Sequence, residues 1–286
     1  MTEPSSGPTI SPIIWHVDDI DWTEVQRQRN ADGTVSVVRE KWPIIRNGFL
    51  SAHVHYEPQM VVRRHGHRSN HVVVVLDGGA HIGIGPDAPW CTAGTHLHVP
   101  LGATFGPIIA GPDGVTCWEV SFGEFGGWGD EPEIVERELR DRGIEPLPDP
   151  PLEIGDWFVD PRGDWGGERP SPRVPGLAEV ILRFDDLPTD TVAPGVHLAR
   201  AIATRDFAST RISLDPGAIF DTTHHGIRDT DRRGTRLLWI DAGSANIDGG
   251  RTTTLHRAGT HVEVAPGAAL PTITAGPDGA IILELV

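Results

Sequence analysis

The sequence has little cysteine and no long apolar run. Its 286 residues include only two cysteines, Cys91 and Cys117, and two thiols cannot form a disulfide framework. Neither has the CxxC spacing of a zinc or redox site, so we expect both to be buried, small apolar side chains. No stretch of about 18 apolar residues occurs, which argues against a membrane-spanning helix. The first residues lack the basic region and apolar run of a signal peptide, so we expect a cytoplasmic protein.

Positive charge is also scarce. Lys and Arg total 24 against 40 Asp and Glu, which gives a formal net charge of −16. A surface this acidic repels phosphate groups, so neither nucleic acid nor an anionic membrane is an expected partner. A small-molecule substrate is the expected partner, and a homodimer is left open.

Glycine and proline are abundant, with 34 and 25 copies. Both residues interrupt regular structure, so many turns and few long helices are expected. Short β-branched segments lie between the turns and predict strands. Examples are residues 51–56, 71–76, 210–214, 236–241 and 260–265. Several such strands at short intervals are typical of an antiparallel sandwich or barrel, so the predicted fold class is all-β.

The chain repeats itself at an offset of 165 residues. Residues 93–114 and 258–279 are identical at 13 of 22 positions, and the match extends upstream to residues 71–78 and 236–243. Self-similarity of this length predicts two homologous units. The expected organisation is a flexible N-terminus at 1–12, an N-terminal domain at 13–122, a linker at 123–175 and a C-terminal domain at 176–286.

The linker differs in composition from the two repeats. Asp130 and Pro132 are helix start signals and Gly143 is a stop signal, so the linker is predicted to contain one short helix. The remainder is rich in Pro, Gly and Trp and is predicted to be irregular. A connection of this length is uncommon unless it covers something.

A histidine cluster stands at the start of the repeated region. His65 and His67 are two residues apart, and on a strand such residues point to the same face. His71 follows closely enough to return as a third ligand. Three neutral imidazoles suit Fe, Mn, Ni, Cu or Zn and do not suit Ca or Mg.

The run from His65 to Gly78 resembles the first motif of the cupin family: His-x-His, three or four residues, usually Glu, then six residues to a Gly. Residues 94–105 resemble the second motif, G(x)5PxG(x)2H. The resemblance implies two cupin-type β-barrels in tandem, joined by a short helical, Pro/Gly-rich linker. It also implies one divalent transition metal ion in the N-terminal domain.

Two positions depart from these motifs. His71 stands where cupins usually have Glu, and Phe105 stands where they usually have His, so the family's fourth ligand is missing from its usual place. His98 is one replacement, because antiparallel pairing around the turn of residues 99–104 would set it beside Phe105. If His98 points outward, it is a sheet-surface residue. The predicted metal ligands are thus His65, His67, His71 and His98.

Other side chains near the motifs are predicted to line a substrate pocket. Arg63 is placed to hold a carboxylate or an enolate, and Phe105 is placed to shield an open coordination position from water. His53 and His55 share one strand face, where they either line the pocket or lie partly exposed. No catalytic residue is assigned from the sequence.

The second half of the chain has lost most of the ligands. Aligning Pro58 with Pro216 sets His65 over Thr223 and His67 over His225. Arg236 replaces His71, and a cation at that position opposes metal binding. The sequence therefore predicts a single metal ion per chain, with no metal in the C-terminal domain.

The predicted function is a metal-dependent cupin enzyme. A ligand set of neutral histidines leaves a dicationic centre, which favours an oxygen-chelating diketone, hydroxyketone or phenolic substrate. With Fe(II) as the favoured metal, and Zn, Mn, Ni or Cu as alternatives, the first hypothesis is a dioxygenase. The same Lewis acidity serves a non-redox isomerase, lyase or hydrolase, and a non-catalytic small-molecule-binding module is a third reading.

Overall fold

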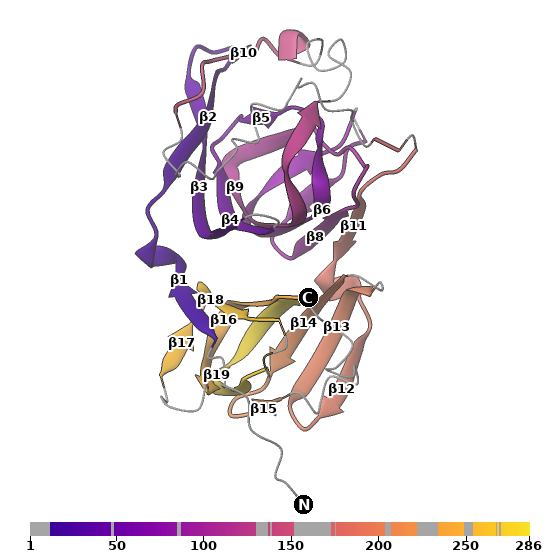
Figure 1. The fold of residues 1–286 in the computed structure, drawn as a ribbon. Helices are drawn as coiled ribbons and strands as arrows, with labels where there is room; N and C mark the ends of the chain where they lie inside the picture. The colour runs from indigo at the N-terminus through magenta and orange to yellow at the C-terminus, as the bar shows by residue number, and fades with distance from the viewer. Residues whose placement is uncertain are drawn as a thin grey trace, which may run out of the picture. The chain divides into compact units, whose positions relative to one another are not determined.

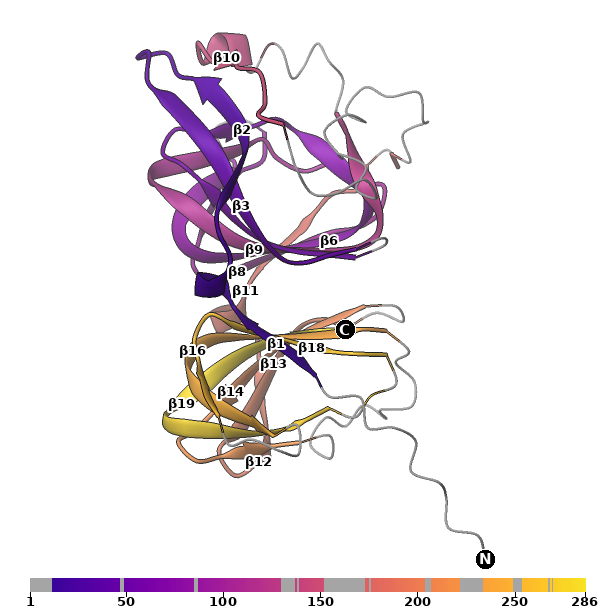
Figure 2. The ribbon, with the colours of Figure 1, turned by 60° about the vertical axis from the view of Figure 1, so that its left-hand side comes forward.

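The computed structural model describes residues 12–46, 49–84, 87–129, 137, 139–151, 173–174, 176–203, 207–221, 234–248, 254–266, 268 and 270–286. The chain divides into two compact units. We call Ile20–Arg183 the N-terminal barrel, and Met1–Asp19 with Phe184–Val286 the C-terminal barrel. The described regular elements of both are almost all strands (Figures 1 and 2), which confirms the all-β prediction.

The N-terminal barrel is a ten-stranded sheet in the order β10-β2-β3-β4-β9-β6-β8-β11, with β5 on β9 and β7 on β6. The pairings are antiparallel, as expected for short strands joined by turns. Its strands are β2 (Thr23–Arg29), β3 (Val35–Arg46), β4 (Phe49–Tyr56), β5 (Val61–Val62), β6 (His65–Ile82), β7 (Trp90–Thr92), β8 (Thr95–Val99), β9 (Ile108–Gly129), β10 (Glu145–Pro146) and β11 (Val180–Arg183).

The C-terminal barrel is a nine-stranded sheet in the order β1-β18-β16-β19-β14-β13-β12, with β15 on β19 and β17 on β16. Its strands are β1 (Ile13–His16), β12 (Thr189–Ala193), β13 (Val196–Ala203), β14 (Ala208–Leu214), β15 (Ile219–Phe220), β16 (Arg236–Asp248), β17 (Leu255–Arg257), β18 (Thr260–Val264) and β19 (Thr272–Leu285).

The two repeats fold in the same way at equivalent positions. Gly78 and Gly243, 165 residues apart, both have φ near +71°, a region that glycine enters without steric cost. A Cβ atom at either would lie 2.2 Å from a carbonyl oxygen, that of Gly114 in one repeat and Gly279 in the other. The same close approach of the backbone in both units shows that the repeat in the sequence corresponds to a repeat in the fold.

Each barrel includes a strand that the expected boundaries assigned to the other domain. Ile13–His16 form β1, which pairs with β18 of the C-terminal barrel, and Val180–Arg183 form β11, which pairs with β8 of the N-terminal barrel. Figure 1 shows indigo β1 beside yellow β18 and orange β11 beside violet β8. The compact units therefore change at Asp19/Ile20 and at Arg183/Phe184, in place of the expected starts at residues 13 and 176.

Part of the linker is described. Leu139–Asp141 are helical, and the Ile144 amide donates to the carbonyl of Leu139 at 2.9 Å. Gly143 has φ +67°, the left-handed conformation typical of a helix end, and this matches its predicted role as the stop signal. The start signals Asp130 and Pro132, most of the linker and nearly all of the N-terminal segment lie outside the described residues.

Each barrel has its own apolar core. In the N-terminal barrel the core includes Val73, Val75, Leu97 and Val99, and it also holds both cysteines, which are free and buried as predicted.

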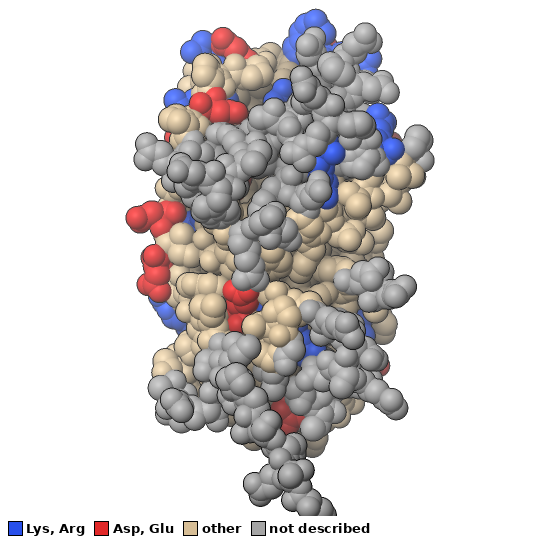
Figure 3. Space-filling view, viewed as in Figure 1, with Lys and Arg blue, Asp and Glu red and all other residues tan. Residues whose placement is uncertain are grey.

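Acidic and basic side chains are scattered over the described surface in Figure 3. No helix in the described part of the chain is long and apolar enough to cross a membrane.

Candidate metal centre

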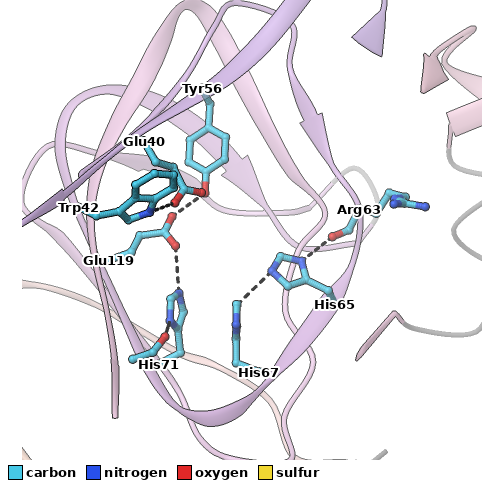
Figure 4. Close-up of polar contacts among 9 residues, drawn as sticks. Glu40, Trp42, Tyr56, Arg63, His65, His67, His71 and Glu119 are labelled. Atoms are coloured by element: carbon cyan, nitrogen blue, oxygen red, sulfur yellow. Dashed lines mark hydrogen bonds and ion pairs between the residues drawn. The ribbon is translucent and has the colours of Figure 1, made fainter. Parts of the chain in front are cut away.

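Strand β6 carries the three predicted histidines to the inner face of the N-terminal barrel. His71 lies two and four residues before Val73 and Val75, which belong to the core, and residues at even spacing share a strand face. A bulge between His67 and Ser69 shifts the register against β9. The structure thus brings His65, His67 and His71 together (Figure 4).

Ring nitrogens of His65 and His67 lie within hydrogen-bond distance of each other. The Nε2 atoms of His65 and His67 are 3.1 Å apart, and the rings of His67 and His71 stack with centroids 4.0 Å apart and planes 22° apart. Burial lowers the pKa of His65 to about 4, and it lowers the pKa of His67 as well, with the charges of His71 and His65 contributing. Both rings are therefore neutral near pH 7, as metal binding requires.

Hydrogen bonds fix the other ring nitrogen of two of these histidines. His65 Nδ1 donates to the carbonyl of Arg63 at 2.7 Å, which assigns the lone pair to Nε2. His71 Nδ1 bonds the hydroxyl of Ser121 at 2.7 Å. A ligand histidine characteristically has its second nitrogen held in this way, because the bond orients the ring.

Glu119 completes the cluster and was not predicted from the sequence. It lies on β9, paired with Ala52 and Val73, and its Oε2 is 3.1 Å from Nε2 of His71. The hydroxyl of Tyr56 donates to Oε1 at 2.5 Å. Burial opposes ionisation of Glu119, but the hydrogen bond and charge of His71, with Tyr56 and His65, outweigh it and lower the pKa of the carboxyl group.

The donor atoms are of the types that bind divalent transition metals. Two atoms that bind neighbouring positions of one ion at about 2.1 Å lie about 3 Å apart, and both the His65–His67 and the His71–Glu119 donor pairs have a spacing of 3.1 Å. As the side chains stand, no three His, Cys, Asp or Glu side chains of the described residues have the geometry to hold an ion. The rings of His67 and His71 stack nearly parallel, so the side chains would have to rearrange for the donors to meet at one ion.

Phe105 packs against all three histidines. Its ring centroid is 4.6, 5.7 and 5.8 Å from those of His65, His67 and His71, and its backbone forms two hydrogen bonds with His65. The guanidinium of Arg64 donates to both oxygens of Thr104 and to the carbonyl of Gly106, which holds the segment on either side of Phe105. Phe105 is therefore a buried apolar wall of the cluster.

The structure does not bring His98 to the cluster, and this corrects its expected place. Leu97 and Val99 on β8 belong to the inner core, so His98 between them faces the other side of the sheet, where it pairs with Val72. The two-residue spacing of His96 and His98 places both side chains on one face of β8. The inner face of that strand is formed by Leu97 and Val99.

The other predicted pocket residues also lie elsewhere. His53 and His55 pair with Trp118 and Thr116 on the face opposite to Glu119, and His55 bonds the Thr116 hydroxyl at 3.0 Å. Both were predicted to line the pocket or to sit on a strand surface, and the structure places them on that outer face. The side chain of Arg63 points away from the rings in Figure 4, although its carbonyl holds His65.

The C-terminal barrel keeps the carboxylate but lacks two of the histidines, because Thr223 and Arg236 align with His65 and His71. Glu284 pairs with Leu238 as Glu119 pairs with Val73, and Arg236 has the place of His71. Arg236 and Glu284 are both buried, at 7% and 3% exposure. The equivalents of the other two histidines, Thr223 and His225, lie outside the described residues.

The comparison with known proteins shows the fold. No family model and no curated protein sequence matches the chain. Among solved structures, a candidate dioxygenase of Nostoc punctiforme matches with a TM-score of 0.62 and 9% identity over 96% of this chain and 81% of that chain. Oxalate decarboxylase of Bacillus subtilis matches with a TM-score of 0.57 and 16% identity over 98% of this chain and 77% of that chain. Another structure of the same enzyme, described with Mn(II) centres, also matches, with a TM-score of 0.57.

The chain therefore has the bicupin fold, two cupin-type barrels in tandem. At these identities the likeness establishes the architecture alone, because one fold hosts many chemistries.

Proposed function

We propose that this protein is a metal-dependent enzyme whose N-terminal barrel binds one divalent transition metal ion through His65, His67, His71 and Glu119. The observation that carries the proposal is the pair of 3.1 Å donor spacings within one buried cluster. The bound ion would supply a Lewis-acidic and, for iron or manganese, redox-active centre.

Glu119 changes the charge expected of this centre. Three histidines alone would leave a dicationic ion, whereas one carboxylate reduces the charge of the ligated centre by one. Nitrogen and carboxylate donors together suit Fe(II), Mn(II) and Zn(II), and Fe(II) remains the first choice for the oxygen chemistry proposed next.

The reaction we assign is dioxygenation of a small oxygen-chelating substrate, of the diketone, hydroxyketone or phenolic type. Phe105 lines all three rings with apolar surface, and a water-poor wall protects reactive species from hydrolysis. The Tyr56 hydroxyl oxygen lies 2.5 Å from Oε1 of Glu119 and holds the proton of that hydrogen bond. The proton remains there because burial, together with the charge of Glu119, raises the pKa of Tyr56 well above its usual range.

The Tyr56–Glu119 pair also supports a second candidate, a non-redox isomerase or lyase. A phenol and a carboxylate are both groups that can take part in proton transfer to or from a substrate, and proton transfer beside a Lewis acid is the chemistry of enolisation.

Oxygen consumption separates the two candidates. Iron-loaded protein is assayed in an oxygen electrode with β-diketones, hydroxyketones and catechols, beside His67→Ala and the exposed control His81→Ala. Uptake with one class in wild type and His81→Ala, and none in His67→Ala, supports the dioxygenase. Substrate turnover without oxygen uptake would support the non-redox reaction. Substrate binding without turnover would show that the protein is a binding module.

A further inference from the structure

The guanidinium of Arg64 binds the chain on both sides of Phe105. Its Nη1 donates to the carbonyl oxygen of Gly106 at 3.0 Å, and its Nη2 donates to the carbonyl and hydroxyl oxygens of Thr104 at 3.2 and 2.8 Å. Hydrogen bonds from a charged donor are stronger than those between neutral groups. Thr104 is buried, so the loss of Arg64 would leave its oxygens without this donor and away from water.

Phe105 in turn contacts the candidate metal centre. Its ring centroid lies 4.6 Å from that of His65, and within 6 Å of those of His67 and His71. The amide of Phe105 donates to the carbonyl of His65 at 2.8 Å, and the amide of His65 donates to the carbonyl of Phe105 at 3.1 Å. Residues 100–107 connect β8 to β9 and form no strand of their own. The place of the Phe105 ring therefore depends on what holds this connection.

The repeat that lost the histidine set also lost this arrangement. With Pro58 aligned to Pro216 and residues 93–114 to 258–279, the equivalents of Arg64, Thr104 and Phe105 are Thr222, Ala269 and Leu270. A threonine has one hydroxyl donor where arginine has five N–H donors, and alanine has no hydroxyl to accept a hydrogen bond. A contact that served only the barrel fold would be expected in both repeats, so its loss together with the ligands associates it with the metal centre.

We infer that Arg64 is a positioning residue of this centre: it holds Phe105 against the histidines and so excludes water from the side that the ring covers. An apolar wall protects a reaction from water only while it stays in place. The inference rests on the proposed metal site, and it assigns Arg64 a role that acts through Phe105 without contact with substrate or metal.

Modification of histidine in metal-free protein tests the wall directly. Diethylpyrocarbonate reacts with a neutral imidazole that solvent reaches, and mass spectrometry locates the modified residue. We expect His65 to react at least about tenfold faster in Arg64→Gln than in wild type, because bonds from a charged donor are lost and local opening becomes easier. Phe105→Ala should show the same rise. Arg29→Gln, which alters an exposed arginine paired with Glu145, should show none.

Two other histidines distinguish a local change from unfolding. His53 and His96 are buried on the other face of the sheet, so they should keep their wild-type rates in Arg64→Gln, whereas a general loss of the fold would expose them as well. If Arg64→Gln fails to fold, Thr104→Val removes a single acceptor and should raise the rate of His65 by about threefold. An unchanged rate of His65 in the folded variant, or equal rises at all three histidines, would overturn the inference.

Cobalt(II) as the bound ion separates this inference from the metal proposal. Its visible absorption is stronger at four- or five-coordinate sites than at six-coordinate sites, so it reports water that joins the ion. At equal cobalt content we expect Arg64→Gln and Phe105→Ala to have at most about half of the wild-type intensity. Unchanged spectra with cobalt fully bound would overturn the inference and leave the metal proposal intact. A wild type that binds no cobalt would overturn the metal proposal on which the inference rests.

Discussion

Glu119 connects two polar neighbours inside the N-terminal barrel, the hydroxyl of Tyr56 and the ring of His71. In the proposed centre it is the fourth donor and the only anionic one, while Tyr56 orients it. Substituting these residues should therefore affect metal affinity to different degrees.

We predict that Glu119→Gln weakens metal binding by about 100-fold and Tyr56→Phe by about tenfold, because an orienting partner matters less than a donor. His98→Ala should leave the affinity within about twofold of wild type, since His98 faces the other side of the sheet. Competition against a chelating dye measures all three values. Loss of affinity in His98→Ala with none in Glu119→Gln would show that the fourth donor was misassigned.

Individual residues of the site were predictable where spacing carries information. Residues two apart on a strand point to the same face, so the pair His65 and His67 followed from the sequence, and His71 followed from its short distance along the chain from that pair. No motif includes Glu119. Its signal lies in the repeat, because residues 115–121 align with 280–286 at the same offset of 165, and Glu119 then falls on Glu284.

At the scale of elements, β1 and β11 each stabilise the barrel in which they lie. Ile14 of β1 packs against the core of the C-terminal barrel, and Ile181 of β11 packs against the core of the N-terminal barrel. This exchange was not predictable, since short strands of similar composition do not specify distant partners.

The two isoleucines give a matched pair of variants. We predict that Ile14→Asp and Ile181→Asp each lower the free energy of unfolding by about 1–3 kcal/mol, because each places a carboxylate against apolar side chains. Hydrogen exchange should rise in the C-terminal barrel for Ile14→Asp and in the N-terminal barrel for Ile181→Asp. Only Ile181→Asp should weaken metal binding. Indistinguishable exchange patterns would contradict the assignment of the strands.

The outer face of the N-terminal sheet carries two buried histidines. Burial lowers the pKa of His53 to about 3, with the charge of Lys41 adding to it, and lowers that of His96 to about 3, with the charge of His98 adding to it. An unfolded histidine titrates near 6.5. The stability gained by keeping these rings neutral is thus complete above about pH 6.5 and declines as the pH falls toward 3.

We therefore predict that the free energy of unfolding falls with decreasing pH because of these two histidines. Between about pH 6 and pH 4, each contributes a slope of about 1.4 kcal/mol per pH unit to the free energy of unfolding. His96→Gln should reduce the slope by that amount in metal-free protein, and His81→Gln, which alters an exposed histidine, should not. Urea denaturation at several pH values gives the slopes, and equal slopes for the two variants would refute the prediction.

Sequence periodicity had limits at this scale as well. Alternation showed that His53 and His55 share a face, as do His96 and His98, but it does not say which face is inside. His96 is buried as well as Leu97 and Val99, so the question is decided for β8 by the packing of Leu97 and Val99 in the inner core, and such packing depends on strands distant in the chain.

The whole molecule is a duplication in which the two barrels have diverged at the candidate metal centre. Where the N-terminal barrel has His71 and Glu119, the C-terminal barrel has Arg236 and Glu284 at the equivalent positions. A guanidinium stays charged at all ordinary pH values, so it supplies a fixed cation where the other barrel would bind a metal ion. The duplication and the two barrels were predictable from the repeat of 165 residues, and the kept carboxylate became visible with the strand register.

The most direct test of the account is the metal stoichiometry of the whole chain. Protein saturated with Fe(II), Mn(II) or Zn(II) and freed of unbound ions is analysed for metal, beside the variant His65→Ala/His67→Ala. The account predicts one equivalent per chain in wild type and a loss of nearly all of it in the variant. Two equivalents in wild type, or a full equivalent retained by the variant, would contradict it.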